Sequence, residues 1–205
     1  MEQPEEGDAS VPAEPEEPGS SAEPEEPDAS VEPEEPTDAA DQGEKADSGE
    51  AEAGQSLTRE LGLIPLEEEV TPPDFTLPTL EGSDITLSEL QGTYVLVNFW
   101  STHCPPCVAE MGYFEAVGSE HSEELEILAV DVQESVSTVR EFLGGGETSF
   151  TVALDEGARV ARSYGIRYTP TTIFIDAKGH APYVKIGAFR SQEQLERSVA
   201  LLLGE

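Results

Sequence analysis

Apolar residues are distributed very differently in the two parts of this 205-residue chain. Residues 1–70 have few apolar positions and almost no aromatic or β-branched ones. From residue 71 onward, apolar runs alternate with amphipathic stretches. TYVLVNFW, residues 93–100, and ELEILAVDV, residues 124–132, are continuous apolar runs typical of strands buried on both faces. The second part is therefore predicted to fold around a central sheet.

Alternating patterns predict two hairpins at the ends of this region. DFTLPTLEGSDITLSEL, residues 74–90, alternates apolar and polar positions around Gly82. TTIFIDAKGHAPYVKIG, residues 171–187, is predicted to turn at Lys178-Gly179. A further short strand is predicted for SFTVAL, residues 149–154.

Helical patterns separate these strands. They cover residues 105–117, 135–145, 156–165 and 191–203. The first helix opens with two prolines, which suit a first helical turn, and the last is amphipathic and begins after Ser191 as an N-cap. Strands that alternate with helices predict an α/β fold of three layers, α/β/α, with a central mixed sheet.

The N-terminal part is predicted to be a disordered linker. Residues 14–40 hold a nine-residue repeat, EPEEPGSSA, EPEEPDASV and EPEEPTDAA, which is too short and polar to stack a core. Proline and like charge extend such a chain, so the repeat is interpreted as a spacer, with a generic acidic tail as the alternative. Disorder is predicted for residues 1–55. The scattered leucines of residues 57–70 are treated as the end of the linker, and the folded domain is expected to span residues 71–205.

Charge narrows the range of partners. The chain has 44 acidic and 10 basic residues, a formal net charge of −34. Such a surface repels nucleic acid and anionic lipid headgroups but not a basic or neutral protein. No run of 18 or more apolar residues occurs, so no transmembrane span is expected, and Met1 is followed by acidic sequence rather than by a signal peptide.

The chemistry suggested by the sequence lies in LVNFWSTHCPPCVAEMG, residues 96–112, which contains both cysteines of the chain. Cys104 and Cys107 stand at a predicted strand-to-helix junction, a pattern that indicates a redox-active dithiol. A thiolate is favoured at the helix N-terminus, so Cys104 is expected to attack a partner disulfide and Cys107 to resolve the mixed disulfide. Pro105 and Pro106 restrict the turn between them.

Other interpretations of the two cysteines are weaker. A structural disulfide would normally join distant segments, whereas this one would close a minimal loop. A metal site would need further ligands, and His103, His121 and His180 lack zinc-finger spacing. No metal ligand is therefore assigned. Chance co-occurrence of the two cysteines is the remaining alternative.

Residues 72 to 203 resemble the thioredoxin-like superfamily, and within it the TlpA/ResA type of extracytoplasmic thiol–disulfide oxidoreductase, which shares the AhpC/TSA redoxin domain. The matching stretches are PDFTLPTLEG, LSELQGTYVLVNFW, CPPCVAEM, YGIRYTPTTIFID and the final helix. The resemblance implies a thioredoxin fold with an N-terminal β-hairpin and a helix–strand insertion at residues 135–154.

The resemblance also implies roles for single residues. Pro170 of YTPTT should follow a cis peptide bond, with Thr169 facing the cysteines. Glu110, three residues after Cys107, corresponds to a buried glutamate that would accept the proton of Cys107; the alternative is an exposed helix residue. Trp100 is expected beside the motif, as a contact surface or as part of the core.

His103 departs from the family pattern, which usually has tryptophan before the first cysteine. A protonated imidazole there would stabilise the Cys104 thiolate and make the couple more oxidising. The alternative is a solvated loop histidine.

The implied function is a thiol–disulfide oxidoreductase acting on exported proteins, most simply as a reductant, with cytochrome c maturation as one process it could serve. It needs no bound cofactor, because the dithiol is the redox group. Its expected partners are proteins with cysteines or disulfides and an upstream membrane thiol donor, and the chain is expected to be a monomer. Relatives of this type are tethered outside the cytoplasmic membrane, so the spacer is expected to follow an anchor that this sequence lacks. A copper-binding chaperone of the same fold and a thiol peroxidase are the alternatives.

Overall fold

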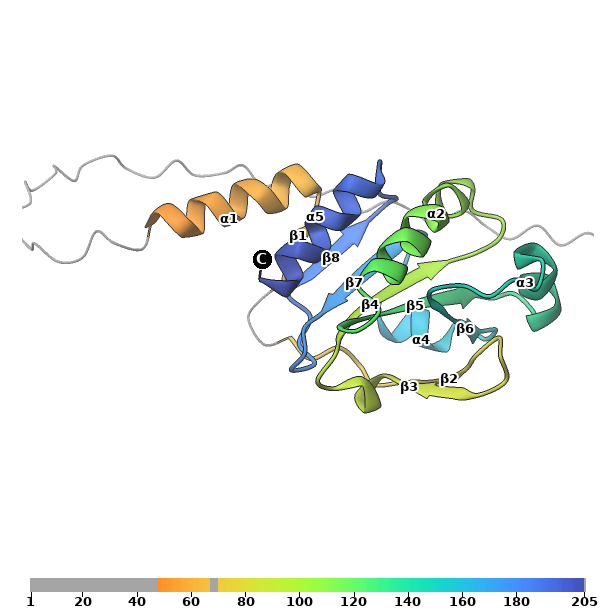
Figure 1. The fold of residues 1–205 in the computed structure, drawn as a ribbon. Helices are drawn as coiled ribbons and strands as arrows, with labels where there is room; N and C mark the ends of the chain where they lie inside the picture. Colours follow the sequence, from red (N-terminus) through yellow and green to blue (C-terminus); the bar gives the residue numbers. More distant parts are fainter. Residues whose placement is uncertain (1–47, 67–69, 205) are drawn as a thin grey trace, which may run out of the picture. The chain divides into compact units, whose positions relative to one another are not determined.

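A six-stranded mixed sheet forms the centre of the molecule in the computed structural model, which describes residues 48–66 and 70–204 (Figure 1). The strand order is β1-β8-β7-β4-β5-β6. The strands are β1 (Ile64–Pro65), β4 (Tyr94–Trp100), β5 (Leu125–Val132), β6 (Thr151–Asp155), β7 (Thr171–Ile175) and β8 (Tyr183–Ile186). β4, β5 and β6 run parallel to one another. β7 is antiparallel to β4, β8 is antiparallel to β7, and β1 is antiparallel to β8.

Helices and a small hairpin complete the fold. The helices are α1 (Ser48–Leu61), α2 (Pro105–Glu120), α3 (Val136–Leu143), α4 (Arg159–Ser163) and α5 (Gln192–Leu203). β2 (Thr76–Pro78) and β3 (Asp84–Thr86) form a separate two-stranded sheet, followed by the 3-10 helix η1 (Leu87–Leu90). The predicted N-terminal hairpin and three-layer α/β architecture are therefore confirmed.

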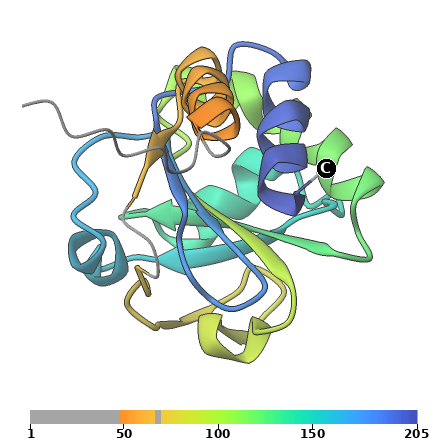
Figure 2. The same ribbon diagram turned by 90° about the vertical axis from the view of Figure 1, so that its left-hand side faces the viewer.

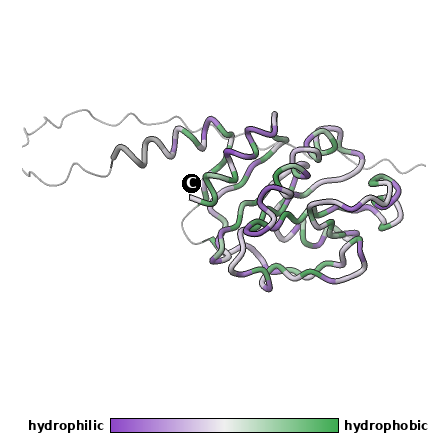
Figure 3. Tube along the Cα trace, in the orientation of Figure 1, coloured by the Kyte–Doolittle hydropathy of each residue, from purple (hydrophilic) through white to green (hydrophobic). Residues whose placement is uncertain are grey.

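Two apolar clusters fill the space on either side of the sheet. One contains Phe114 of α2, Val139 of α3 and Leu195 of α5, and the other contains Leu77 of β2 and Val160 of α4. Figure 2 shows α2 and α5 on one side of the sheet, with α4 and the β2–β3 hairpin on the other. β4 is apolar on both faces because it contributes side chains to both clusters. α5 contributes only one face, and Figure 3 shows hydrophobic and hydrophilic residues alternating along it.

The domain begins earlier in the chain than predicted. α1 and β1 precede residue 70, and Leu61 and Leu63 are 1% and 4% exposed within the same apolar cluster as α2 and α5. The side-chain amide of Gln194 also donates a hydrogen bond to the carbonyl of Leu61 at 2.6 Å. The boundary expected at residue 70 is thus wrong, because these leucines bury apolar area that stabilises the segment.

The predicted disorder of residues 1–55 lies largely outside the described residues. Its last eight residues are described and form the beginning of α1, so the prediction fails there.

The helix predicted for residues 156–165 is also shorter than expected, since Ala158 has a left-handed backbone and α4 starts only after it. Within the part of the chain that the structure covers, none of the helices combines the length and apolar character needed to span a bilayer.

Candidate active site

The two cysteines lie where β4 passes into α2, and they form a disulfide with each other. Cys104 is the N-cap of α2, and its Sγ accepts a hydrogen bond from the backbone N–H of Cys107 at 3.3 Å. Pro105 and Pro106 occupy the first two helical positions and have no N–H, so Cys107 supplies the first free backbone donor of the helix. The helix N-terminus is therefore directed at the sulfur of Cys104, which favours a thiolate there.

The two sulfurs differ in environment. Cys104 is 8% exposed and Cys107 only 1% exposed, while Pro105 and Pro106 between them are exposed. Cys104 is thus closer to the surface, and Cys107 lies deeper in the apolar cluster beneath α2. This difference agrees with the order of attack inferred from the motif.

Strand β7 brings Pro170 to the same end of the sheet. β4 and β7 are antiparallel, with Phe99 opposite Thr171, so Trp100 and Pro170, the next residues along each chain, lie at the same end of the sheet. The Thr169–Pro170 bond is cis, as the resemblance implied. The carbonyl of Pro170 accepts a hydrogen bond from the Gly187 N–H at 2.8 Å, which ties this loop to the end of β8. Thr169 is partly exposed in the same loop.

Glu110 is a buried residue of α2, 1% exposed, and not a surface glutamate. Its Oε1 accepts a hydrogen bond from the side-chain amide of Asn98 at 3.3 Å, and its Oε2 accepts one from the Phe189 N–H at 2.8 Å. Burial raises the pKa of Glu110 to about 7, although these hydrogen bonds and the charge of Lys185 act in the opposite direction. The carboxyl lies one helical turn from Cys107 and is able to exchange a proton near neutral pH.

His103 points away from the core, with a side chain that is 82% exposed. Its Nδ1 lies 2.7 Å from Oε1 of Glu134, whose side chain is only 8% exposed. Glu134 also accepts hydrogen bonds from the N–H and the hydroxyl of Thr102, both at 2.6 Å. Burial opposes ionisation of Glu134, but its hydrogen bonds prevail and lower its pKa. A carboxylate thus balances any positive charge on the imidazole next to Cys104.

Trp100 is 1% exposed and belongs to the apolar cluster that also contains both cysteines. Its parallel neighbour on β5 is Asp131, which is 0% exposed. Among the described residues, the indole Nε1 and both carboxyl oxygens of Asp131 have no hydrogen-bond partner. Burial, together with the neighbouring Glu134, raises the pKa of Asp131 to about 8. Trp100 is therefore mainly a core residue, with a buried acid beside it.

Sequence reasoning missed several polar residues of the site: Asn98, Thr172, Lys185, Asp131 and Glu134. One signal was available for Asn98, which is the single amide in an otherwise apolar strand run. The others stand at ordinary alternating or loop positions, and only the strand order brings them to the site.

Two of the three histidines weighed as metal ligands, His121 and His180, lie away from the cysteines. His121 is the C-cap of α2, about 24 Å along the helix from its N-terminus at 1.5 Å per residue. His180 lies in the β7–β8 turn, where its backbone N–H donates to Asp176 at 2.9 Å. Across residues 54–66 and 70–204, no group of three or more His, Cys, Asp or Glu side chains could hold a metal ion.

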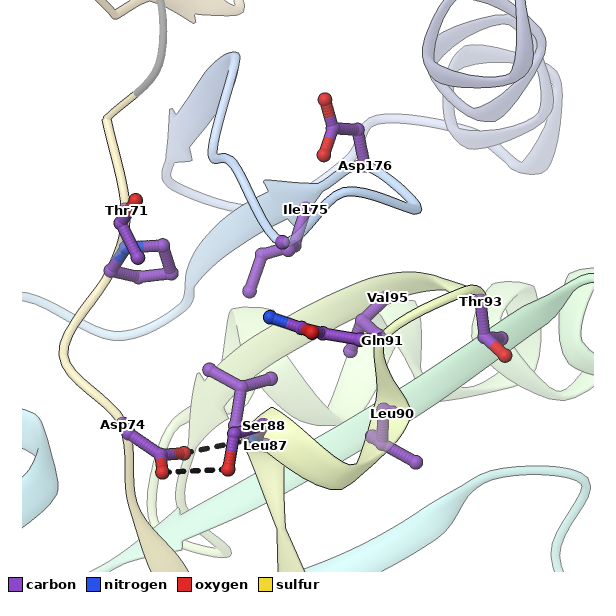
Figure 4. Close-up of a pocket in the computed structure, with 12 residues that line it drawn as sticks. Thr71, Asp74, Leu87, Ser88, Leu90, Gln91, Thr93, Val95, Ile175 and Asp176 are labelled. Carbon is purple, nitrogen blue, oxygen red and sulfur yellow. Dashed lines mark hydrogen bonds between the residues drawn. The ribbon is translucent and has the colours of Figure 1, made fainter.

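A cavity of about 70 Å³ lies at the opposite end of β4, lined by Val95 among others (Figure 4). The carboxylates of the two acidic residues that line it already accept hydrogen bonds from neighbouring groups. Asp74 accepts hydrogen bonds from the N–H and hydroxyl of Ser88 at 2.9 and 2.7 Å, and Asp176 accepts two backbone N–H groups in its turn. The opposite end of the sheet holds the Cys104–Cys107 disulfide and is the candidate site.

Comparison with known proteins points to the same chemistry. The AhpC/TSA family model matches residues 70–184. The chain is 42% identical, over 120 residues, to the thiol-disulfide oxidoreductase ResA of Halalkalibacterium halodurans, a match that covers 58% of this chain and 68% of the relative.

Solved structures share the fold. A thiol:disulfide interchange protein of the thioredoxin family from Chlorobium tepidum has a TM-score of 0.61 and 25% identity, and the match covers 68% of this chain and 99% of that one. A secreted disulfide oxidoreductase of Mycobacterium tuberculosis, described as homologous to DsbE of E. coli, has a TM-score of 0.56 and 25% identity, covering 66% of this chain and 99% of that one. The family match, residues 70–184, includes Cys104 and Cys107.

Proposed function

The chain belongs to the AhpC/TSA family and is a thiol–disulfide oxidoreductase of the TlpA/ResA type with a thioredoxin fold, and on this basis we propose that it reduces disulfides in exported proteins. Its substrates are proteins with cysteines. The observation that carries the proposal is the Cys104–Cys107 disulfide at the N-terminus of α2, with the more exposed sulfur on the N-cap residue. The dithiol is itself the redox group, so the proposed reaction requires no bound cofactor.

The proposed reaction has two exchange steps. The Cys104 thiolate attacks a partner disulfide, a mixed disulfide forms, and one partner thiolate leaves. Cys107 then gives its proton to the Glu110 carboxylate and attacks Sγ of Cys104. The second partner thiolate leaves, and the Cys104–Cys107 disulfide forms. Two electrons pass from this chain to the partner, and an upstream thiol donor, proposed to be a membrane protein, must restore the dithiol.

Two features of the site favour a reductant. The carboxylate of Glu134 offsets a positive charge on His103, so the imidazole adds little stabilisation to the Cys104 thiolate. Ionised Glu110 disfavours a second negative charge on Cys107. Both effects make the reduced form of this protein less stable than the reduced form of a strong oxidant such as DsbA.

We place this activity outside the cytoplasmic membrane, with the acidic N-terminal segment as the spacer to an anchor. The similarity to a secreted disulfide oxidoreductase supports this location, and the repeat at residues 14–40 suits a spacer. Cytochrome c maturation is the process that we propose for the reductant, as the resemblance to the TlpA/ResA type implies.

The test uses a chain with Cys107 replaced by Ser. Wild-type protein should reduce insulin disulfides with dithiothreitol as donor, and Cys107→Ser should accumulate a mixed disulfide with a substrate peptide. The Cys104→Ser variant is the control and should trap nothing. A trap formed by Cys104→Ser alone would reverse the order of attack, and no insulin reduction by the wild type would reject the function. A redox titration then measures the reduction potential, which indicates the direction of electron flow. The potential of a reductant should lie near that of thioredoxin, about −270 mV, rather than near that of DsbA, about −120 mV.

A further inference from the structure

A row of buried polar side chains crosses the sheet beneath α2. Asn98 on β4 pairs with Thr172 on β7, and Thr172 pairs with Lys185 on β8. Residues paired across neighbouring strands point to the same face of a sheet, so the three side chains form one line. Their exposed fractions are 3%, 1% and 6%. Glu110 enters the same layer from α2, which makes four polar groups in an otherwise apolar cluster.

Hydrogen bonds join three of these groups. The Asn98 amide donates to Thr172 Oγ1 at 3.0 Å and to Glu110 Oε1 at 3.3 Å. The second carboxyl oxygen of Glu110 accepts the Phe189 N–H. The carboxyl group is therefore held by a donor on each oxygen, and both donors favour its ionised form.

Lys185 contributes the charge of the row. Its Nζ lies 5.3 Å from the centroid of the Phe189 ring, the residue whose N–H binds Glu110. The backbone of Gly62, at the end of α1, covers it so closely that a Cβ at Gly62 would come within 3.3 Å of Nζ. A lysine is seldom buried without a charged partner, and Glu110 is the acidic group that acts on Lys185 here.

We propose that Lys185 is a positioning residue for the resolving step: its buried ammonium keeps Glu110 in the carboxylate form that accepts the proton of Cys107. This inference rests on the proposed function and names a residue that the motif does not contain. Water is largely excluded from the layer, so the attraction between the two charges is screened less than at the surface. The ammonium does not take part in the proton transfer.

Among the described residues, few other titratable groups lie on this side of the sheet, and the buried Asp131 of β5, beside Trp100, is one of them. α2 contributes Cys104 and Cys107. The segment before α5 contributes Arg190, whose like positive charge lowers the pKa of Lys185. β4 and β7 contribute only the uncharged Asn98 and Thr172. The charged residues at the α1–α5 contact are exposed and include the ion pair of Glu60 with Arg197 at 2.8 Å. Tyr94, Tyr113 and Tyr183 lie at the edge of the cluster.

The test compares Lys185→Met, which keeps the length and removes the charge, with Lys185→Arg, which keeps the charge. In Lys185→Met the Glu110 carboxyl should titrate at higher pH, measured by NMR of a 13C-labelled glutamate side chain in the oxidised protein. The acid limb of the resolution rate should move up by about one pH unit, which is about tenfold slower resolution on that limb. The first attack by Cys104 should be unchanged, and Lys185→Arg should restore the wild-type limb.

Controls separate this inference from the function itself. Lys178→Met removes one exposed charge from the β7–β8 turn and should leave both readouts unchanged. In a Glu110→Gln background, Lys185→Met should have no further effect on the pH profile. If Lys185→Met fails to fold, Lys185→Gln takes its place. An unchanged Glu110 titration and an unmoved acid limb would overturn the role of Lys185, even while insulin reduction by the wild type upholds the oxidoreductase.

Discussion

Glu110 is the residue whose protonation most directly limits the proposed reaction. Its pKa is raised to about 7 by burial, so it is a base above neutral pH and is increasingly protonated below it. The resolving step should therefore slow as pH falls through about 7, because a protonated carboxyl cannot accept the proton of Cys107.

Glu110→Gln keeps the shape of the side chain and removes the base. We expect resolution to become about 10- to 100-fold slower near neutral pH, with a much smaller change in the first attack by Cys104. Stopped-flow kinetics with a disulfide peptide would resolve the two steps. Equal resolution rates in wild type and variant from pH 6 to 9 would leave Glu110 as a structural residue only.

Glu134 is expected to tune the couple through charge. Glu134→Gln should keep the hydrogen bond from the Thr102 N–H but remove the negative charge beside His103. The Cys104 thiolate should then be more stable, with a pKa lower by up to about one unit, equivalent to a reduction potential higher by up to about 30 mV.

Two measurements check this expectation: a glutathione titration for the potential and thiolate absorbance for the Cys104 pKa. Glu115→Gln, which also loses a charge but near the middle of α2, is the matched control and should shift neither quantity. A more negative potential in Glu134→Gln would show that His103 does not act on Cys104 in the direction proposed.

Local motifs and nonlocal contacts differ in how far a sequence reveals them. Cys104 and Cys107 could be located beforehand from their spacing, and Glu110 and Pro170 from the resemblance of their short motifs to the TlpA/ResA family. The row formed by Asn98, Thr172 and Lys185 could not, because it depends on strand order and on the register between strands far apart in the chain.

Among the elements, α1 is a helix that the composition of the sequence around it does not indicate. Its chain neighbours are acidic and rich in proline, and only the spacing of Leu57 and Leu61, four residues apart, indicates an apolar face. Whether that face is buried depends on α5, which lies more than 130 residues later and contacts it. The central strands needed no such information, because their apolar runs are continuous.

The contribution of α1 can be measured with two neighbouring residues. Leu61→Ala should lower the free energy of unfolding by about 2–5 kcal/mol, because it opens a cavity beside α5. Ile64→Ala is the control; its side chain is 47% exposed, so a change within about 1 kcal/mol is expected. Urea unfolding followed by circular dichroism gives both values. Equal losses in the two variants would mean that α1 does not pack as described.

The end of β5 carries an acid that should make stability depend on pH. The pKa of Asp131 is about 8 in the folded chain, against an ordinary value of 3.8. The folded state therefore binds more protons than the unfolded state between these values, and stability should fall as pH rises from about 4 to 8. Glu110 acts in the same direction over a narrower range, up to about pH 7.

Asp131→Asn should flatten this dependence, because the amide cannot ionise, and should stabilise the protein at pH 8 by at least about 1.4 kcal/mol, the equivalent of one pKa unit. Urea midpoints at pH 5, 6.5 and 8 would show it, and Asp84→Asn, at an exposed position of β3, serves as the control. A wild-type stability that rises over this interval would be incompatible with a buried, protonated Asp131.

At the scale of the whole molecule, charge and chemistry are divided along the chain. Residues 1–70 carry 24 acidic and 2 basic side chains, a net charge of −22, while residues 71–205 carry 20 and 8, a net of −12. Both parts repel polyanions, so basic or neutral proteins remain the favoured partners. The redox site, in contrast, lies within residues 71–205, where the paired strands β4 and β7 meet the N-terminus of α2.

The position of Trp100 also gives the protein an optical property. It is the only tryptophan in the chain, and it shares an apolar cluster with Cys104 and Cys107. A disulfide close to an excited indole accepts an electron from it, so emission should be dim in the oxidised protein and brighten when the bond is reduced. A variant with both cysteines replaced by serine should be bright and insensitive to dithiothreitol. The turnover of this enzyme should thus be visible in its own fluorescence, without an attached dye.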